Sequence, residues 1–452
     1  MAEILFNNQG VPLMAFGNSF FAQTTGAPKD RDKRVQEPAA QPDKISVNEL
    51  EVAEWGKNNK FPDDADAVIS RIGVLNTGLR YIRNFTLGQG IYPVKVTGYD
   101  EKGNELVKIV DDADLRYFVN SRMVRRYLEK ALRDYLKFGI AQVQLLPNLT
   151  GNEMIGINTI NAKYCRLSVA GSDGRIGNCV VSGKWPEIPS DKGDYHIMDV
   201  LDEYDPAFHL QRLRNDKSMK DKSFIFTIRD SWSNNEYYSS PIWYSAYLAG
   251  WTDIAFAVPR FLQKAFENQI SWKWHVQIPY VFFDKKFPVT SFKTEKERED
   301  AINAFMDQIE TNLCNPDNAN KAIFTMFEIN PNNGKVEEQW IIKPLDNKLN
   351  SEQNLITSAA CNSEILFSLM VNPNVMGAGM PGGSYAGNQG GSNIREAFLV
   401  NIANAWIDRQ NLLDPLEAFL RFNGKYTDVE LRFRNTILTT LDTGAGTAKT
   451  IS

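Results

Sequence analysis

One long stretch of this chain is rich in glycine and has no charged residue, and it separates two segments of regular pattern. Residues 371–394 read VNPNVMGAGMPGGSYAGNQGGSNI, and no residue between Glu364 and Arg395 is charged. Glycine lacks a Cβ atom and adopts backbone conformations that other residues avoid, so this stretch is predicted to be a flexible loop. Its glycines stand at positions 377, 379, 382, 383, 387, 390 and 391.

Helix-forming segments lie on both sides of the loop. Before it, apolar residues recur at helical spacing over 355–369, and Pro373 ends the pattern because proline has no backbone N–H to donate. After it, Ser392 can cap a second helix whose apolar residues keep the same spacing until Gly424. The sequence therefore predicts two strong helices joined by one uncharged loop.

A glycine-rich loop before a helix can bind phosphate through its bare backbone amides. A nucleoside-triphosphate loop needs GxxxxGK followed by serine or threonine, and a dinucleotide loop needs a strand before its glycines. This loop contains no lysine or arginine, and a helix precedes it. The pattern argues against nucleotide binding and leaves two interpretations, a linker or a mobile loop with a function.

Composition excludes several classes of protein. The formal net charge of the 452 residues is -5, so bulk attraction to DNA phosphates is not a binding force. Four cysteines, at 165, 179, 314 and 361, have no CxxC spacing and do not cluster with the three histidines, so we expect neither a metal site nor a disulfide framework. No secretory signal, membrane span or catalytic constellation is evident. We expect no enzyme activity and no cofactor.

The segments that flank the loop follow a distinctive order. The sequence YSSP at 238–241 starts a long helix, and a strand, a helix and a hairpin form an insert over about 276–346. LFSLMVNP at 366–373 then precedes the loop, and SNIRE at 392–396 opens the next helix. This order resembles the portal proteins of tailed bacteriophages over roughly residues 60–435 and most sharply over 364–396. No single motif is diagnostic; the order, the spacing and the loop chemistry carry the resemblance together.

The resemblance implies an α+β chain with the phage portal fold, which has a β-rich wing, long stem helices, a small α/β clip, a glycine-rich tunnel loop and here a minimal or absent crown. The implied domains are an N-terminal arm and linker (1–45), the wing (46–238), a stem helix (239–275), the clip (276–346), a second stem helix (347–370), the tunnel loop (371–393), a wing-side helix and strand (394–435) and a flexible tail (436–452).

The resemblance also implies a function. Portal proteins form a homo-oligomeric ring, by family expectation of twelve subunits, at one vertex of the viral head. Double-stranded DNA is packaged and ejected through the ring, and the terminase large subunit and a tail adaptor dock on it. Such a ring is assembled in the host cytoplasm, meets the major capsid protein and remains in the virion. Another ring-forming head or tail component, without DNA passage, is the alternative.

Two sets of residues follow from the resemblance. The DNA-facing residues of the tunnel loop would be Asn374, Met376, Met380, Ser384, Tyr385, Asn388 and Gln389. The partner-docking residues of the clip would be Phe282, Asp284, Lys285, Lys286, Asn332, Asn333 and Lys335. DNA contact is expected to be weak and independent of base sequence, because the loop has no charge.

Upstream of the insert, the pattern predicts a β-rich body. Apolar alternation and turn signals predict antiparallel strands between Ile140 and Trp232, after a hairpin over 90–109. One helix is predicted over 114–138, and a short one over 49–60. The helix that starts at Ser239 and reaches about Ser271 has aromatic residues on several faces, which indicates contacts with identical neighbours; a central helix of a monomeric domain is the alternative.

One face of the predicted 114–138 helix is basic. Its cations are Arg122, Arg125, Arg126, Lys130 and Arg133. The acids interleaved with them are Asp112, Asp114, Glu129 and Asp134. Such a stripe can touch DNA, but the mixture of signs favours a solvated face with local ion pairs or subunit contacts.

Overall fold

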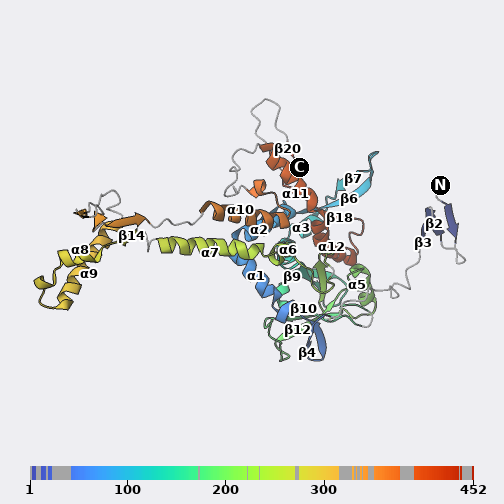
Figure 1. Ribbon diagram of the computed structural model, residues 1–452. Helices are drawn as coiled ribbons and strands as arrows, with labels where there is room; N and C mark the ends of the chain where they lie inside the picture. The colour runs from blue at the N-terminus through green and yellow to red at the C-terminus, as the bar shows by residue number, and fades with distance from the viewer. Residues whose placement is uncertain are drawn as a thin grey trace. The chain divides into compact units, whose positions relative to one another are not determined.

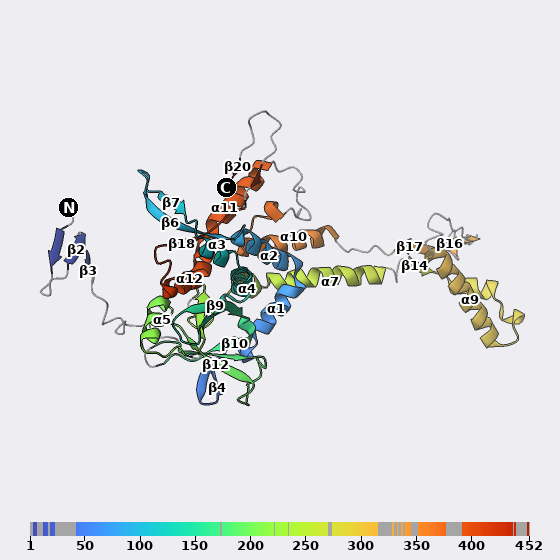
Figure 2. The same cartoon turned by 180° about the vertical axis from the view of Figure 1, so that it is seen from behind.

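The chain divides into two compact units in the computed structural model (Figures 1 and 2). Unit 1 comprises Met1–Ser70, Asn76–Tyr244 and Phe398–Ser452, and unit 2 comprises Arg71–Leu75 and Ser245–Ala397. The structure describes residues 3–6, 12–16, 19–22, 42–171, 174–220, 222–233, 235–269, 274–314, 328–329, 332, 336–337, 340–344, 351–376, 391–436, 438–439 and 450–451.

A six-stranded sheet with the order β10-β11-β12-β13-β8-β9 forms the centre of unit 1. Its strands lie where the sequence alternates apolar and polar residues. Helix α5 (Pro206–Asn215) lies between β12 and β13 along the chain. The strands are β8 (Ile140–Pro147), β9 (Met154–Ile160), β10 (Cys165–Leu167), β11 (Asn178–Ser182), β12 (Tyr195–Val200) and β13 (Phe224–Arg229). The prediction of a wholly antiparallel body is wrong at one pair. β12 and β13 are parallel, because α5 provides the crossover that a parallel connection needs.

Helix α4 (Arg122–Phe138) packs on β8 and β9. The single helix predicted over 114–138 is in fact two, α3 (Ala113–Val119) and α4. The reason is Ser121, whose hydroxyl accepts a hydrogen bond from the Val124 amide at 3.2 Å and so begins a new helix. α4 ends at Gly139, where φ is 77° and an added Cβ would clash with the Ser239 carbonyl.

A buried arginine of β10 contacts the segment that follows the hairpin of β4 (Lys44–Val47) and β5 (Leu50–Ala53). The Arg166 guanidinium lies between the rings of Trp55 and Trp185, 5.4 and 5.2 Å from their centroids. It also donates to the side chain and carbonyl of Asn59 in the 3-10 helix η2 (Lys57–Asn59). The short helix predicted over 49–60 is therefore wrong, since this stretch forms β5 and η2.

A second sheet of unit 1 has the order β18-β6-β7. It consists of β6 (Ile91–Tyr99), β7 (Glu105–Ile109) and β18 (Glu430–Phe433). Helix α3 contacts β6, and α12 (Trp406–Asn423) contacts β18. Helices α1 (Phe61–Arg71) and α2 (Gly73–Leu87) precede β6 along the chain. Arg409 of α12 donates to the carbonyls of Phe85 and Thr86 at 3.0 and 2.9 Å and to Asn435 at 2.7 Å. This arginine holds the C-terminal helix to the end of α2.

In unit 2, the helices α7 (Trp251–Gln269) and α10 (Ser351–Ser368) lie side by side (Figures 1 and 2). The predicted start of a long helix at Ser239 is wrong. A short helix α6 (Tyr244–Leu248) ends at Gly250, where φ is 80°, and α7 begins after it. At 1.5 Å per residue, α7 is about 28 Å long, well short of a helix running from 239 to 271.

The insert of unit 2 contains the remaining described elements before α10. They are β14 (Trp274–Gln277), α8 (Tyr280–Lys286), the 3-10 helix η4 (Val289–Ser291), α9 (Glu295–Cys314), β15 (Glu328–Ile329), β16 (Val336–Glu337) and β17 (Ile341–Pro344). β14 pairs with β17, and β15 with β16. Strand β14 is followed by α8, and Pro279 occupies the N-cap position of that helix.

Short elements occur near both ends of the chain. The predicted arm contains a three-stranded sheet of β1 (Glu3–Phe6), β2 (Pro12–Phe16) and β3 (Ser19–Ala22). The predicted tail contains β19 (Leu438–Thr439) paired with β20 (Thr450–Ile451). No helix among the described residues is long and apolar enough to cross a membrane.

Candidate functional site

Helix α10, which leads into the glycine-rich loop, ends in a defined backbone motif. The Val371 amide donates to the Leu366 carbonyl at 3.0 Å and the Met370 amide to the Phe367 carbonyl at 2.9 Å. Met370 has φ 54°, a left-handed conformation that glycine normally takes at this place. Leu366 and Val371 are both buried. The stop therefore comes before Pro373, through hydrogen bonds and an apolar contact, and not at the proline as the sequence suggested.

The described residues reach only the start of the predicted tunnel loop. Asn374 and Met376 belong to a 3-10 turn, η6 (Pro373–Met376), and Met376 is half-buried. The other predicted DNA-facing residues, Met380, Ser384, Tyr385, Asn388 and Gln389, lie outside the described residues. The chain is described again from α11 (Gly391–Asn404). The single helix predicted from Ser392 to Gly424 is in fact two, because the helical pattern is interrupted at Ala405, after which α12 begins.

Firm packing holds the chain on both sides of the loop. On the side of α10, the residues Cys361, Ile365, Leu366 and Leu369 are buried. On the side of α11, the buried Asn401 donates to the Tyr81 hydroxyl of α2 at 3.3 Å. Further along, Arg409 of α12 donates to the carbonyls at the end of α2.

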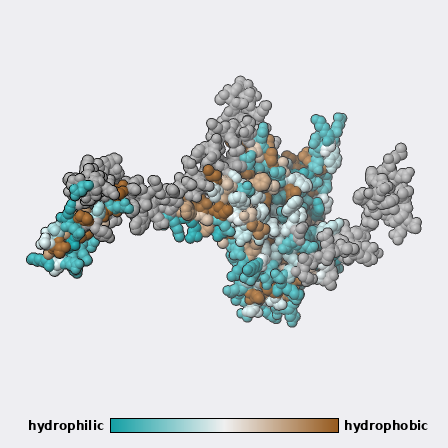
Figure 3. Space-filling model, in the orientation of Figure 1, coloured by the Kyte–Doolittle hydropathy of each residue, from teal (hydrophilic) through white to brown (hydrophobic). Residues whose placement is uncertain are grey.

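Helices α7 and α10 also expose large apolar side chains. On α10, Phe367 is 80% exposed and Ile356 is 62% exposed; on α7, Phe261 is 51% exposed. Figure 3 shows apolar and hydrophilic residues mixed on the visible face of this helix pair. Ile356 and Phe367 lie eleven residues apart, which brings them to the same side of a helix after three turns. The sequence pattern included Ile356 in the apolar stripe of this helix and Phe367 in the LFSLMVNP motif, but it did not indicate that both side chains are exposed.

The insert has an aromatic core of its own. Phe282 of α8 lies 5.9 Å from Phe305 of α9 and 4.9 Å from Trp340, between ring centroids. The Lys286 ammonium lies 3.4 Å from the Phe305 centroid and faces Phe282 and Phe287 at longer range. Cation–π attraction of this kind fixes a lysine on an aromatic surface. Lys286 therefore helps to hold the insert together.

The other predicted docking residues have varied surroundings. Asp284 forms an ion pair with Arg298 at 2.5 Å, and Arg298 also donates to the Phe287 carbonyl at 2.8 Å. Lys285 is exposed on α8, and Asn332 is exposed in a turn. Asn333 and Lys335 lie outside the described residues. Phe282, Asp284 and Lys286 are thus engaged within the insert, and Lys285 has an exposed side chain on α8.

Unit 1 contains a cavity of about 410 Å³ between β10, β12 and β13. Four of its charged residues form two pairs. Arg229 binds Glu203 through two hydrogen bonds, and Arg175 lies 3.8 Å from Asp202. Burial lowers the pKa of the neighbouring His209, whose Nδ1 accepts a hydrogen bond from the Asp202 amide at 3.0 Å. Ion pairing gives these groups a structural role in the sheet.

The sequence has no match among family models or curated proteins, but solved structures resemble the fold. A chain in the neck of an empty gene transfer agent particle, computed with C6 symmetry, has TM-score 0.55 and 15% identity over 84% of this chain and 85% of that one. A chain in the virion of the native particle has TM-score 0.53 and 14% identity over 86% of each chain. A chain in the native neck, computed with C12 symmetry, has TM-score 0.51 and 14% identity over 82% and 84%.

At this identity the likeness is one of fold. The chain has the mixed helix-and-sheet fold of a component of phage-like particles, across more than four fifths of its length. The resemblance to the portal proteins that the sequence suggested is confirmed at this level, and so is the α+β class. The C6 and C12 symmetries belong to the necks of the gene transfer agent particle.

Proposed function

We propose that this chain is a portal protein. Its copies close into a ring, of twelve subunits by family expectation, at one vertex of a viral head, and double-stranded DNA enters and leaves through the ring. In this proposal the six-stranded body is the wing, α7 and α10 are the stem, the insert is the clip and the 371–393 loop lines the tunnel. The crown is minimal or absent, and the chain performs no catalysis.

The likeness to neck chains over more than 80% of both partners is the observation that carries the proposal. Two features of unit 2 support it. The apolar residues that α7 and α10 expose are suited to contacts with neighbouring copies, since patches of this kind mark interaction sites. The 371–393 loop follows the helix pair without a charged residue. Symmetric necks in the gene transfer agent are consistent with a closed ring here.

An uncharged loop suits a channel through which DNA must move. A protein that neutralises several phosphates releases counterions and binds tightly, so each cation in a channel would resist translocation. Asparagine, serine and tyrosine side chains make transient hydrogen bonds instead. Glycine gives each subunit's loop the backbone freedom to shift as the duplex passes. The proposed loop therefore touches DNA without holding it.

The insert is the proposed docking site for the terminase large subunit and later for the tail adaptor, and the wing is the proposed contact for the major capsid protein. Lys285 gives a test of docking, because its side chain is exposed on α8 and a partner can reach it. Lys285→Glu should impair packaging and tail attachment while the insert stays folded. Normal packaging and attachment with this variant would remove that surface from the proposal.

The alternative function is a ring-forming head or tail component without DNA passage. A loop variant with added positive charge distinguishes it from a portal. The triple variant Asn374→Lys, Ser384→Lys and Asn388→Lys should slow packaging or ejection at low salt, because each subunit then adds three phosphate contacts. The defect should ease as salt screens them. A matched control adds three lysines at exposed positions of unit 1, namely Gln211, Asn215 and Thr427. Equal rates for both variants at every salt concentration would favour the alternative.

A further inference from the structure

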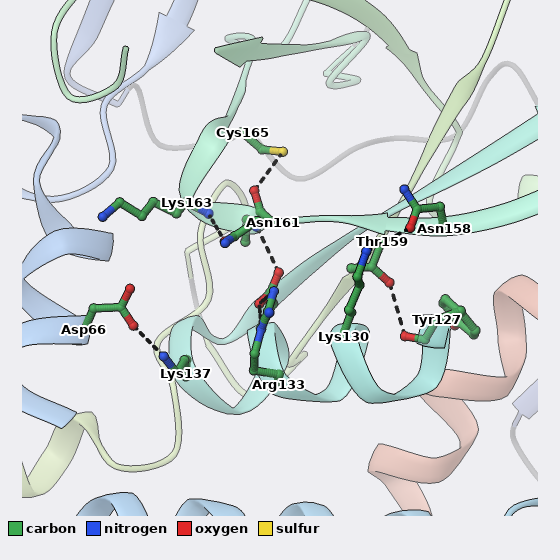
Figure 4. A network of polar contacts seen from close by, with 12 residues as sticks. Asp66, Tyr127, Lys130, Arg133, Lys137, Asn158, Thr159, Asn161, Lys163 and Cys165 are labelled. Carbon is green, nitrogen blue, oxygen red and sulfur yellow. Dashed lines mark hydrogen bonds and ion pairs between the residues drawn. The ribbon is translucent and has the colours of Figure 1, made fainter. Parts of the chain in front are cut away.

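The exposed side of α4, in unit 1, is a run of cations. All four residues of α4 in the exposed class are charged, and three of them are Arg122, Arg125 and Arg126. None of the ion pairs or side-chain hydrogen bonds among the described residues involves these three arginines. Lys130, one turn further on, donates to the uncharged amide of Asn158 at 3.3 Å and not to an acid (Figure 4).

The acids that alternate with these cations in the sequence lie mostly elsewhere. The Asp134 side chain is 0% exposed and accepts hydrogen bonds from Arg133 and from the Ala162 amide. Asp112 caps α3 through the Leu115 amide at 2.9 Å and also accepts from the Tyr426 hydroxyl at 2.8 Å. On the exposed face of α4 itself, Glu129 is the acid that remains. The face is therefore more positive than the sequence suggested.

The cations also stand at the unfavourable end of the helix. The positive end of a helix dipole favours acids in the first turn. The first turn of α4 has none, as in α2, α5, α8 and α11, and three arginines occupy its first five residues. The helix terminus and the guanidinium groups therefore attract an anion together.

We propose that this face of α4 binds the phosphate backbone of double-stranded DNA, independently of base sequence. Guanidinium groups form paired hydrogen bonds with phosphate oxygens. From Arg122 to Arg133 the helix extends about 16 Å, and successive phosphates of one strand are about 3.4 Å apart along the DNA axis. The exposed residues of the face include no apolar side chain, which argues against a protein partner, since protein interfaces have an apolar centre. This inference does not rest on the portal proposal.

Fluorescence anisotropy with a labelled 20-base-pair duplex tests the proposal on the full-length chain. The triple variant Arg122→Gln, Arg125→Gln and Arg126→Gln should bind at least about tenfold more weakly at 50 mM salt, and the dependence of log K on log salt should become shallower by about 2 to 3. The control variant Lys57→Gln, Lys60→Gln and Lys192→Gln removes the same charge from exposed sites of unit 1 and should bind nearly as wild type does. Thermal melting of the arginine variant should not fall below wild type, because cations leave the helix N-terminus.

Four outcomes would overturn the proposal. The first is a wild type that does not bind the duplex at 50 mM salt, and the second is an arginine variant that binds like the wild type. The third is a lysine control that loses as much affinity as the arginine variant, which would indicate bulk charge alone. The fourth is polyglutamate of equal total charge that displaces the duplex completely at equal concentration and binds more tightly than it, which would assign the face to an acidic protein segment.

Discussion

Helices α4 and α7 have similar lengths and opposite surroundings. α4 spans 17 residues rich in arginine and lysine, yet a row of its side chains from Val124 to Phe138 is buried against the sheet. α7 spans 19 residues and is more apolar. Among the residues of α7 whose exposure is described, only Thr252 is buried. Ile254 and Phe261 of α7 are exposed. Unit 1 thus buries the apolar side chains of α4, whereas α7 leaves large apolar side chains exposed.

The comparison indicates that the two helices are stabilised in different ways. A helix with a charged face and an apolar face completes a core within its own chain. A helix that exposes apolar residues on several sides needs partners beyond the chain, and the proposed ring supplies them. Substitutions in α4 should therefore change the stability of the monomer, and substitutions on α7 should change assembly.

The largest effect is expected on α7. The double variant Ile254→Glu and Phe261→Glu should prevent ring closure, because burying each such side chain contributes about 1.5–3 kcal/mol and the glutamates would bring buried charge. Native mass spectrometry at micromolar concentration should show monomers, with a melting temperature close to that of wild-type monomer. Rings of wild-type size would show that this face of α7 lies outside the interface.

The matching change in α4 should act on the monomer. Leu132 is fully buried, and Leu132→Ala should lower the free energy of unfolding by about 2–5 kcal/mol through lost transfer energy and a cavity. Urea unfolding followed by tryptophan fluorescence measures this loss. A loss below about 1 kcal/mol would mean that α4 is not anchored in a packed core as described.

The contact between α4 and α12 should depend on pH. Burial raises the pKa of Asp408 to about 6, aided by the charge of Asp230 and opposed by a hydrogen bond with Tyr135. Because the folded pKa exceeds the unfolded value, the associated stability is full below pH about 4 and is lost as the pH rises through 6. Asp408→Asn should therefore gain about 1 kcal/mol more over wild type at pH 8 than at pH 5. Chemical denaturation at both pH values checks this, and an equal gain would contradict it.

The smallest effect concerns the end of α10. Met370 is 62% exposed and has a left-handed backbone, which costs a residue with a Cβ atom about 1–2 kcal/mol. Met370→Gly should raise the stability of unit 2 by about 0.5 kcal/mol, since glycine removes that strain but has more freedom in the unfolded chain. Met370→Val should lower it. Thermal melts of the two variants would refute the motif if their order were reversed.

Residue patterns predicted the helices and most of the sheet because each depends on local spacing. In the strands of the body and the helices around the loop, apolar residues recur at the spacing of the element, and many of these residues are buried. Helix ends were less predictable. Gly139 marks the end of α4 by its residue type, whereas Met370 ends α10 in a conformation that its residue type disfavours. The split at Ser121 depends on one hydroxyl whose bond the sequence did not reveal.

The candidate site shows the same limit. The position and neutrality of the 371–393 loop could be read directly, since both depend on residue types alone. The engagement of Lys286 could not, because it requires Phe305, nineteen residues away on another helix. The basic face of α4 was underestimated for the same reason: burial of Asp134 and the bonds of Asp112 arise only when the sheet and α12 are in place.

The central claim is that copies of this chain form a ring whose opening is lined by residues 372–393. Electron microscopy of the purified protein, with a gold label attached through Ser384→Cys in a Cys314→Ser background, tests both parts at once. The account predicts closed rings with a central hole and label density at the narrowest part of that hole. Label density on the outer rim, or assemblies without a hole, would contradict it.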